Sequence, residues 1–332
     1  MTSFPSPNGA IGFPWPAGSA TGIGSMPGTD VAEAQRVVLG ELPDLPHLPE
    51  LPARGPGADM IGRAGAFLVE LPIELYAARW RVAARPGHDL RVARDLLERD
   101  LDTMTEQAGE FGGLFKVQVP GPWTLAASLG LPIGGQVLRD PGAARDLAAS
   151  LAEGVRAHVA QVRARLPHAS VLLQLDEPSL PAVLAGRVPT ESGFGTLRSV
   201  DPAVARAALS EVIAAAGVPV VVHCCASSVP LVLLREAGAV GVALDLSLVH
   251  DLDALGEQLD AGMGLFAGVS GRTSAEQAGQ VRDLWRKLGF PLKTMAEQAV
   301  VTPPCGLPAE ARVRSALTAV REAGRRLTDD LD

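Results

Sequence analysis

The sequence predicts a single α/β domain, a (β/α)8 barrel of the TIM type with a long first loop over its mouth. The 332-residue chain is 47% apolar, which is enough for one large core. Short apolar runs alternate with amphipathic segments as far as the C-terminus, as βαβ units do. These runs are continuous rather than alternating, which is typical of parallel strands buried on both faces.

Eight apolar runs are the candidate strands, and most of them end in a small, polar or metal-ligating residue. In chain order they are 20–24, 66–71, 114–119, 171–175, 218–222, 240–244, 264–268 and 299–302. The helical periodicity of the intervening segments predicts a helix after most of these strands. The predicted helices are 31–39, 90–108, 143–166, 202–215, 229–237, 252–260, 275–288 and 309–327. Eight strand–helix units would close a barrel.

Two segments interrupt this alternation. Residues 41–59 carry a proline at about every third position, which excludes a helix. Together they form most of a Pro/Gly-rich loop, 41–63, which we expect to be a lid over the mouth or a rigid wrap on the surface. Residues 120–140 are predicted to be a second long loop, and loops of this length are usually functional or disordered. Residues 1–18 are assigned to an N-terminal extension of a single domain, 1–332.

Composition narrows the possible functions. The net charge of −8 does not suit a protein that binds nucleic acid or an anionic membrane. No apolar run approaches the ~18 residues that a membrane-spanning helix needs, and the first twenty residues do not form a secretory signal. We therefore expect a cytoplasmic protein. There, three cysteines indicate catalysis, metal binding or burial rather than disulfides.

The ends of the predicted strands carry the candidate functional residues, because catalytic groups of such barrels collect at the carboxyl ends of the strands. In chain order these residues are Ser25, Gln118, Asp176, Glu177, His223, Cys224, Cys225, Asp245, Ser270 and Cys305. All three cysteines of the chain belong to this set.

His223, Cys225 and Cys305 are predicted to bind zinc. His223 and Cys225 are two residues apart and project to the same side of an extended strand end, so Cys224 should face away and pack as a small hydrophobe. Imidazole and thiolates are the ligands of catalytic zinc, which keeps one position open. Asp245 could add an oxygen ligand. A single buried cysteine or histidine is more often structural, so the prediction depends on the combination.

Two further segments have open interpretations. The carboxylates of Asp176–Glu177 could bind a substrate ammonium group or pair with an arginine, since a buried carboxylate needs a partner. The glycine-rich segment 22–28 could present backbone N–H groups to a carboxylate. An ordinary tight turn is the favoured interpretation, because the segment lacks the spacing of a nucleotide-binding loop.

Several motifs together resemble the catalytic barrel of cobalamin-independent methionine synthase. They are Ile23–Gly24–Ser25 before Met–Pro, Asp59–Met60, Gly121–Pro122, Leu175–Asp176–Glu177–Pro178, His223–x–Cys225 and Pro304–Cys305–Gly306–Leu307. The resemblance implies zinc on His223, Cys225 and Cys305, with Asp245 at the place of a glutamate ligand. It also implies that Ile23, Gly24, Ser25 and Asp176 hold the amino-acid part of homocysteine. We include Met60 among the substrate-binding candidates.

The sequence departs from the family pattern where the methyl donor binds. Ser128 replaces a tryptophan that would stack on folate, Ala182 replaces a glutamate, and Val269 replaces a histidine that transfers a proton. Around 54–59 no residue matches the acidic residue that in the family helps bind the substrate ammonium group. The resemblance therefore implies a zinc-dependent methyltransferase acting on homocysteine or another small thiol. Its donor is an open question, and single-barrel relatives suggest a methylated corrinoid, either free or carried by a partner protein.

Two alternatives belong to other classes. One is a metal-free enzyme similar to uroporphyrinogen decarboxylase, in which Arg54, Arg63 and Arg79 would bind the propionates of a tetrapyrrole. It leaves the His and Cys pattern unexplained. The other is a zinc-bound pseudoenzyme with a regulatory or binding role, consistent with the changes at Ser128 and Val269.

Overall fold

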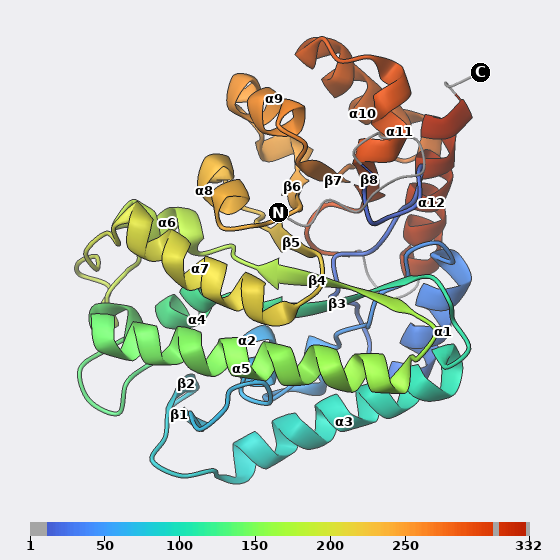
Figure 1. Ribbon diagram of the computed structural model, residues 1–332. Helices are drawn as coiled ribbons and strands as arrows, with labels where there is room; N and C mark the ends of the chain where they lie inside the picture. Colours follow the sequence, from blue (N-terminus) through green and yellow to red (C-terminus); the bar gives the residue numbers. More distant parts are fainter. Residues whose placement is uncertain (1–11, 308–311, 330–332) are drawn as a thin grey trace.

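The computed structural model describes residues 12–307 and 312–329, and a curled parallel sheet lies at its centre (Figure 1). Its six strands follow one another in chain order, and each pairs with the next. They are β3 (Leu114–Pro120), β4 (Ser170–Asp176), β5 (Val220–His223), β6 (Gly241–Asp245), β7 (Gly264–Gly268) and β8 (Ala299–Thr302). These elements confirm six of the eight predicted strands.

The eight predicted helices are confirmed, with ends shifted by a few residues. They are α1 (Val31–Glu41), α3 (His88–Ala108), α5 (Pro141–Arg165), α7 (Pro202–Ala216), α8 (Leu231–Glu236), α9 (Leu252–Asp260), α10 (Ser274–Leu288) and α12 (Val313–Thr328). Part of the predicted span of the last helix, 309–311, lies outside the described residues. Each of these helices contacts the next one, and α12 contacts α1. The helices therefore surround the sheet.

The proline-rich segment is neither a lid nor a surface wrap, and this prediction is wrong. Residues 46–50 run alongside β3, where Leu48 N donates to Lys116 O (2.9 Å) and Lys116 N donates to Pro46 O (2.9 Å). On the other side Glu50 N donates to Gly24 O (3.0 Å). Proline cannot donate a hydrogen bond, but here Pro46 supplies only its carbonyl, so the extended segment still pairs. Its leucines, Leu45, Leu48 and Leu51, are no more than 1% exposed.

The first two predicted strands are also corrected. Residues 20–24 contain only an isolated bridge, in which Thr21 N donates to Val301 O (3.0 Å). Residues 66–71 form no strand, because α2 (Met60–Ala64) and a turn bury Phe67 and Leu68 against the core without sheet pairing. An antiparallel hairpin of β1 (Ile73–Tyr76) and β2 (Arg79–Val82) follows instead.

Short helices occupy other predicted loops. The predicted loop 120–140 contains α4 (Pro122–Ser128) and the 3-10 helix η2 (Val137–Arg139), so it is not a continuous loop. The other short elements are η1 (Pro52–Arg54), α6 (Leu180–Leu184), η3 (Leu246–Leu248), η4 (Leu292–Thr294) and α11 (Met295–Gln298).

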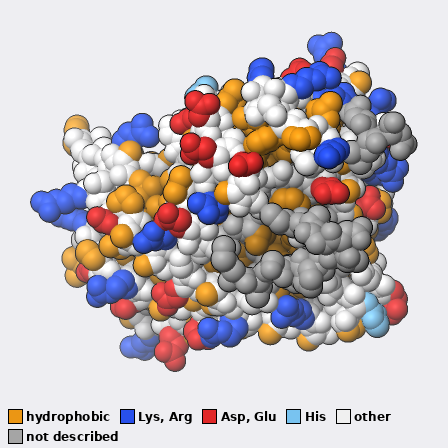
Figure 2. Space-filling model, turned by 45° about the horizontal axis from the view of Figure 1, so that its top comes forward, with side chains coloured by type: hydrophobic (Ala, Val, Ile, Leu, Met, Phe, Trp, Pro, Cys, Tyr) orange, Lys and Arg blue, Asp and Glu red, His pale blue; other side chains and the backbone are white. Residues whose placement is uncertain are grey.

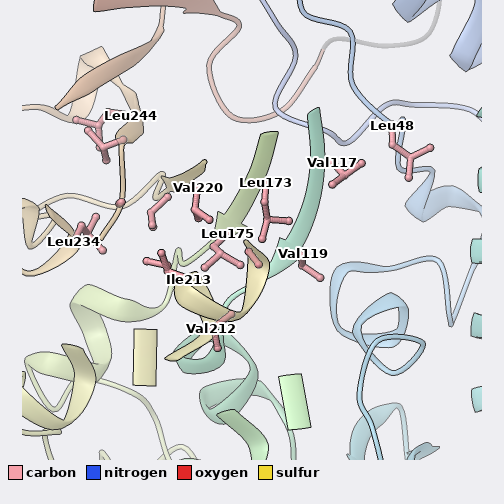
Figure 3. Packing of buried hydrophobic residues seen from close by; sticks show 14 of the residues in the cluster. Leu48, Val117, Val119, Leu173, Leu175, Val212, Ile213, Val220, Leu234 and Leu244 are labelled. Atoms are coloured by element: carbon pink, nitrogen blue, oxygen red, sulfur yellow. The ribbon is translucent and has the colours of Figure 1, made fainter. Parts of the chain in front are cut away.

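The core has two parts. Inside the curl of the sheet, each strand contributes one residue to a single cluster with Leu45 and Trp15; the strand residues are Leu114, Leu172, Val221, Ala243, Phe266 and Val300. Trp15 belongs to the predicted N-terminal extension, yet its ring packs edge-on against Phe266 at 4.9 Å. The larger part fills the space between the strands and the helices, and Val119, Leu175 and Val212 belong to it (Figure 3). Because the middle of the sheet is filled by these apolar side chains, the polar groups of the site lie at the carboxyl ends of the strands.

His158 on α5 makes the stability of the fold sensitive to acid. Its ring is 3% exposed and packs against Phe67, with ring centroids 4.7 Å apart. Burial, helped by the charge of Arg63, lowers the pKa of His158 from 6.5 to about 3. Between pH 6.5 and pH 3 this histidine is protonated in the unfolded chain but neutral in the folded chain. The free energy of unfolding therefore falls as the pH drops below 6.5.

Replacing His158 with leucine should therefore reduce the acid sensitivity. Between pH 7.5 and pH 5 we expect the variant to lose about 2 kcal/mol less free energy of unfolding than the wild type. Urea unfolding at the two pH values measures this difference. The matched control is His168→Leu, because His168 is exposed. An equal loss in His158→Leu and wild type would contradict the prediction.

Candidate metal and substrate site

Three side chains meet at the carboxyl ends of β5 and β8. The ligand atoms of His223, Cys225 and Cys305 all lie within 4.8 Å of one another. His223 is the last residue of β5 and is buried, Cys225 is half-buried, and Cys305 is exposed three residues after β8. The curl of the sheet thus brings together residues that are 80 positions apart in the chain.

Cys224 lies outside this cluster, as predicted. It is 1% exposed, and its backbone N–H donates to Ala243 O (3.0 Å). Burial raises the pKa of its thiol to about 12. Cys224 is therefore a neutral core residue, whereas the adjacent Cys225 belongs to the cluster.

Asp176 orients the histidine. It is the last residue of β4 and the register partner of His223, and its Oδ1 lies 2.8 Å from His223 Nδ1. Because Nδ1 is engaged, Nε2 is the ring nitrogen that can bind a metal. A carboxylate on the second nitrogen is the usual partner of a metal-binding histidine.

The electrostatics of the cluster stabilise a thiolate. Hydrogen bonds from Cys305 and His223 lower the pKa of Cys225 to about 4. The hydrogen bond to Cys225 and burial raise the pKa of Cys305. Burial lowers the pKa of His223, but hydrogen bonds to Asp176 and Cys225 outweigh it and raise the pKa to about 9. A low-pKa cysteine is typical of metal-binding and reactive sites.

Asp245 is close to the cluster but is not part of it. Its Oδ1 accepts hydrogen bonds from Ser247 N (2.9 Å) and Ser247 Oγ (2.6 Å), so it caps η3. Its negative charge contributes to the raised pKa of Cys305. The structure thus brings together three of the four predicted metal ligands.

The predicted substrate segment lies beside β3 and β4. Ile23 O accepts a hydrogen bond from Gln174 Nε2 (2.7 Å). Gly24 has a φ of 135°, and a Cβ there would lie 2.8 Å from Gln118 Nε2, so the position requires glycine. Ser25 is exposed, and Met60 begins α2 with 41% exposure.

Glu50 is a candidate that the sequence did not reveal. Its Oε1 lies 3.5 Å from Arg63 Nε. Burial raises the pKa of Glu50 to about 7 against the effect of Arg63, and the charge of Asp176 raises it further. Segment 41–59 was interpreted as a loop, so Glu50 was not considered as a residue at the end of an extended segment. Its signal was an acidic residue among buried leucines.

Glu177 has a structural role. Its carboxylate accepts from Trp123 N (2.9 Å), Thr124 N (2.8 Å) and Thr124 Oγ1 (2.8 Å), and so fixes the first turn of α4. Burial raises the pKa of Glu177 to about 7. Neither Asp176 nor Glu177 pairs with an arginine within 12–307 and 312–329, so the salt-bridge interpretation is wrong for these residues.

The three arginines considered for a tetrapyrrole do not form a group. Arg54 holds Asp100 with two hydrogen bonds of 2.7 and 2.8 Å, and Arg63 holds the same carboxylate at 2.6 Å. Asp100 is fully buried on α3. Arg79 is exposed on the β1–β2 hairpin. Two of the three cations are thus already paired.

Fold and cluster together define a parallel α/β protein with a His–Cys–Cys group that could hold a metal ion at the carboxyl edge of its sheet. Residues 18–326 match the family described as "Cobalamin-independent synthase, Catalytic domain", and the chain belongs to this family. It is a family of methyltransferases. The resemblance inferred from the motifs is therefore confirmed.

Solved structures with a similar fold include a B12-independent methionine synthase from Shewanella sp. W3-18-1 in complex with selenomethionine. It is 14% identical, with a TM-score of 0.58, and the match covers 95% of this chain and 99% of that chain. A protein described as a lactate oxidase, from Pediococcus acidilactici, is 11% identical over 80% of this chain and 75% of its own, with a TM-score of 0.31. No curated protein matches the chain by sequence. Among the described residues, no helix is both long and apolar enough to cross a membrane.

Proposed function

We propose that this chain is a zinc-dependent methyltransferase that methylates homocysteine, or another small thiol, to give methionine or the corresponding thioether. The observation that carries the proposal is the convergence of His223, Cys225 and Cys305, with Asp176 on the far nitrogen of the histidine. Imidazole and two thiolates fit zinc and leave a position for the substrate sulfur. Asp245 is proposed as a further ligand through its second carboxylate oxygen.

When bound, zinc supplies the charge that keeps a substrate thiol deprotonated at neutral pH. The substrate sulfur then forms a bond to the methyl carbon while the bond between that carbon and the donor breaks, and its electron pair leaves with the donor. The protein holds the two reactants in line, which removes most of the entropic cost. His223 is kept in the correct tautomer by Asp176.

The amino-acid end of the substrate is proposed to lie over the sheet edge next to the cluster. The segment Ile23–Gly24–Ser25 would bind the carboxylate, with Met60 nearby. Asp176 and Glu50 would bind the ammonium group, because both are carboxylates at this edge and the charge of Asp176 acts on Glu50. On this proposal, the carboxylate of Asp176 contacts both the metal-binding His223 and the substrate ammonium group.

We propose that the sheet and the extended segments 19–26 and 46–50 act as one closed (β/α)8 ring and form a single domain. Isolated bridges join Ala20 to Val301, Ser25 to Glu50, and His47 to Lys116. This ring would place Ser25, Glu50 and Asp176 on the same rim as the cluster.

The donor is proposed to be a methylated corrinoid rather than a folate. Ser128, the last residue of α4, offers no aromatic surface for a folate ring, and Val269, which is 1% exposed after β7, offers no proton donor.

On the face shown in Figure 2, acidic and basic side chains are interspersed. Such a surface does not favour a nucleic acid as partner.

Metal content and thiol binding test the proposal together. Protein purified without chelators should contain about one equivalent of zinc, measured by elemental analysis. Titration with homocysteine in two buffers of different ionisation enthalpy should show release of about one proton per site. Absence of zinc would overturn the proposal. Zinc with no uptake of any small thiol would favour the pseudoenzyme.

A further inference from the structure

Lys116 is a fully buried cation in the middle of β3. It is 0% exposed, and it lies deeper in the sheet than Pro120, the register partner of Asp176. Burial lowers the pKa of Lys116 to about 7 against the charges of Asp176 and Glu50. A buried lysine is rare and costs free energy unless its donors are satisfied.

The lysine fixes the orientation of one amide. Its Nζ donates to Gln174 Oε1 (2.7 Å), to Gln118 Oε1 (3.0 Å) and to Ile23 O (3.4 Å). Because the oxygen of Gln174 faces Lys116, its Nε2 must face the other way. This Nε2 donates to Ile23 O (2.7 Å) and to Asp176 Oδ1 (2.7 Å).

The same oxygen of Asp176 that accepts from Gln174 also lies 2.8 Å from His223 Nδ1. A continuous chain of hydrogen bonds therefore runs from Lys116 through Gln174 and Asp176 to His223, with a branch to Ile23. We propose that Lys116 is a positioning residue that, through Gln174, sets Asp176 against His223 and couples the metal end of the site to its amino-acid end. This inference rests on the proposed function, which gives His223 a metal to bind.

Loss of the lysine would release the amide. If Gln174 turned over, its oxygen would face Asp176 Oδ1, and two acceptors at hydrogen-bond distance repel each other. Asp176 would then move away from His223, which would lose its fixed orientation. Changes in groups that orient metal ligands typically weaken metal binding by 10- to 100-fold. For the loss of Lys116 we expect about a tenfold decrease in metal affinity, the lower end of this range, because Lys116 acts through Gln174.

The test is Lys116→Met in the full-length protein, since methionine keeps an unbranched side chain, one atom shorter than that of lysine, without the charge. Zinc affinity, measured by competition with a chromophoric chelator, should fall about tenfold. The visible ligand-field bands of the Co²⁺-loaded protein should shift, because the geometry at His223 changes. The urea midpoint should fall, because the buried oxygens of Gln174 and Gln118 each lose a hydrogen-bond donor.

Gln298→Met is the matched control. Gln298 on α11 loses two buried hydrogen bonds, to Leu259 O (2.7 Å) and Met263 O (2.9 Å), but has no link to Asp176. It should lower stability without moving the Co²⁺ bands. If Lys116→Met fails to fold, Gln174→Met carries the same test, because it removes both donors to Ile23 and Asp176.

The outcomes separate the two proposals. Wild-type zinc affinity and unchanged bands in Lys116→Met, or in Gln174→Met where that variant carries the test, overturn this inference and leave the proposed function intact. Weaker zinc with shifted bands supports it. A wild-type protein that binds neither Zn²⁺ nor Co²⁺ overturns the proposed function and this inference with it.

Discussion

Replacing Cys225 with alanine is expected to remove zinc from the protein, whereas the same change at Cys224 is expected to leave the zinc content unchanged. The two cysteines are adjacent, but Cys225 meets His223 and Cys305, while Cys224 is 1% exposed in the core. Zinc held by four ligands has an apparent binding free energy of about 10–16 kcal/mol. Divided over four ligands, this is about 2.5–4 kcal/mol each, so loss of one thiolate should weaken binding by roughly a hundredfold to a thousandfold, and methyl transfer should fall below detection.

Elemental analysis and chelator competition on the two purified variants measure this difference. Cys224→Ala controls for the loss of a thiol and for any change in packing. The same assay compares Asp245 with His223 as zinc ligands. Because Asp245 Oδ1 already accepts hydrogen bonds from Ser247, Asp245→Ala should weaken zinc binding less than His223→Ala does. Full zinc in Cys225→Ala would show that the cluster is not the metal site.

The sequence predicted this cluster for a physical reason. Parallel strands end at one edge, so His223, Cys225 and Cys305 could be placed together from strand order alone. The spacing of two residues also predicted correctly that Cys224 faces away. Strand order does not determine the orientation of the Asp245 carboxylate relative to the cluster, because that orientation depends on the hydrogen bonds from Ser247. The fourth ligand could therefore not be predicted from the sequence.

The part that the sequence did not predict lies around residues 46–50. Prolines there suggested a loop, but the pairing of this segment uses carbonyls and the N–H groups of Leu48 and Glu50. Glu50 was missed for that reason. Gln118 is among the strand-end candidates, but an apolar run does not by itself predict the buried polar network, although Lys116 and Gln118 share one face of β3. Two polar residues at this spacing in a buried strand are a signal for an interior network.

Asp176→Asn is expected to separate the two roles of this carboxylate. Gln174 Nε2 donates to Oδ1, so an asparagine should keep its oxygen there and still accept from His223. Zinc affinity should then fall by less than about tenfold. The charge that would bind the substrate ammonium group is lost, however. Loss of one partner of a buried charge pair costs about 2–5 kcal/mol, so we expect homocysteine to bind about a hundredfold more weakly.

A substrate lacking the ammonium group isolates this effect. Wild-type protein should bind homocysteine much more tightly than 4-mercaptobutanoate. In Asp176→Asn this preference should be about a hundredfold smaller, as measured by calorimetric titration of the zinc-loaded proteins. Asp176→Ala should lose zinc as well, because His223 Nδ1 then has no acceptor and the ring can turn over. If Asp176→Asn kept the wild-type preference for homocysteine, the ammonium group would be bound elsewhere, and Glu50 would be the next carboxylate to replace.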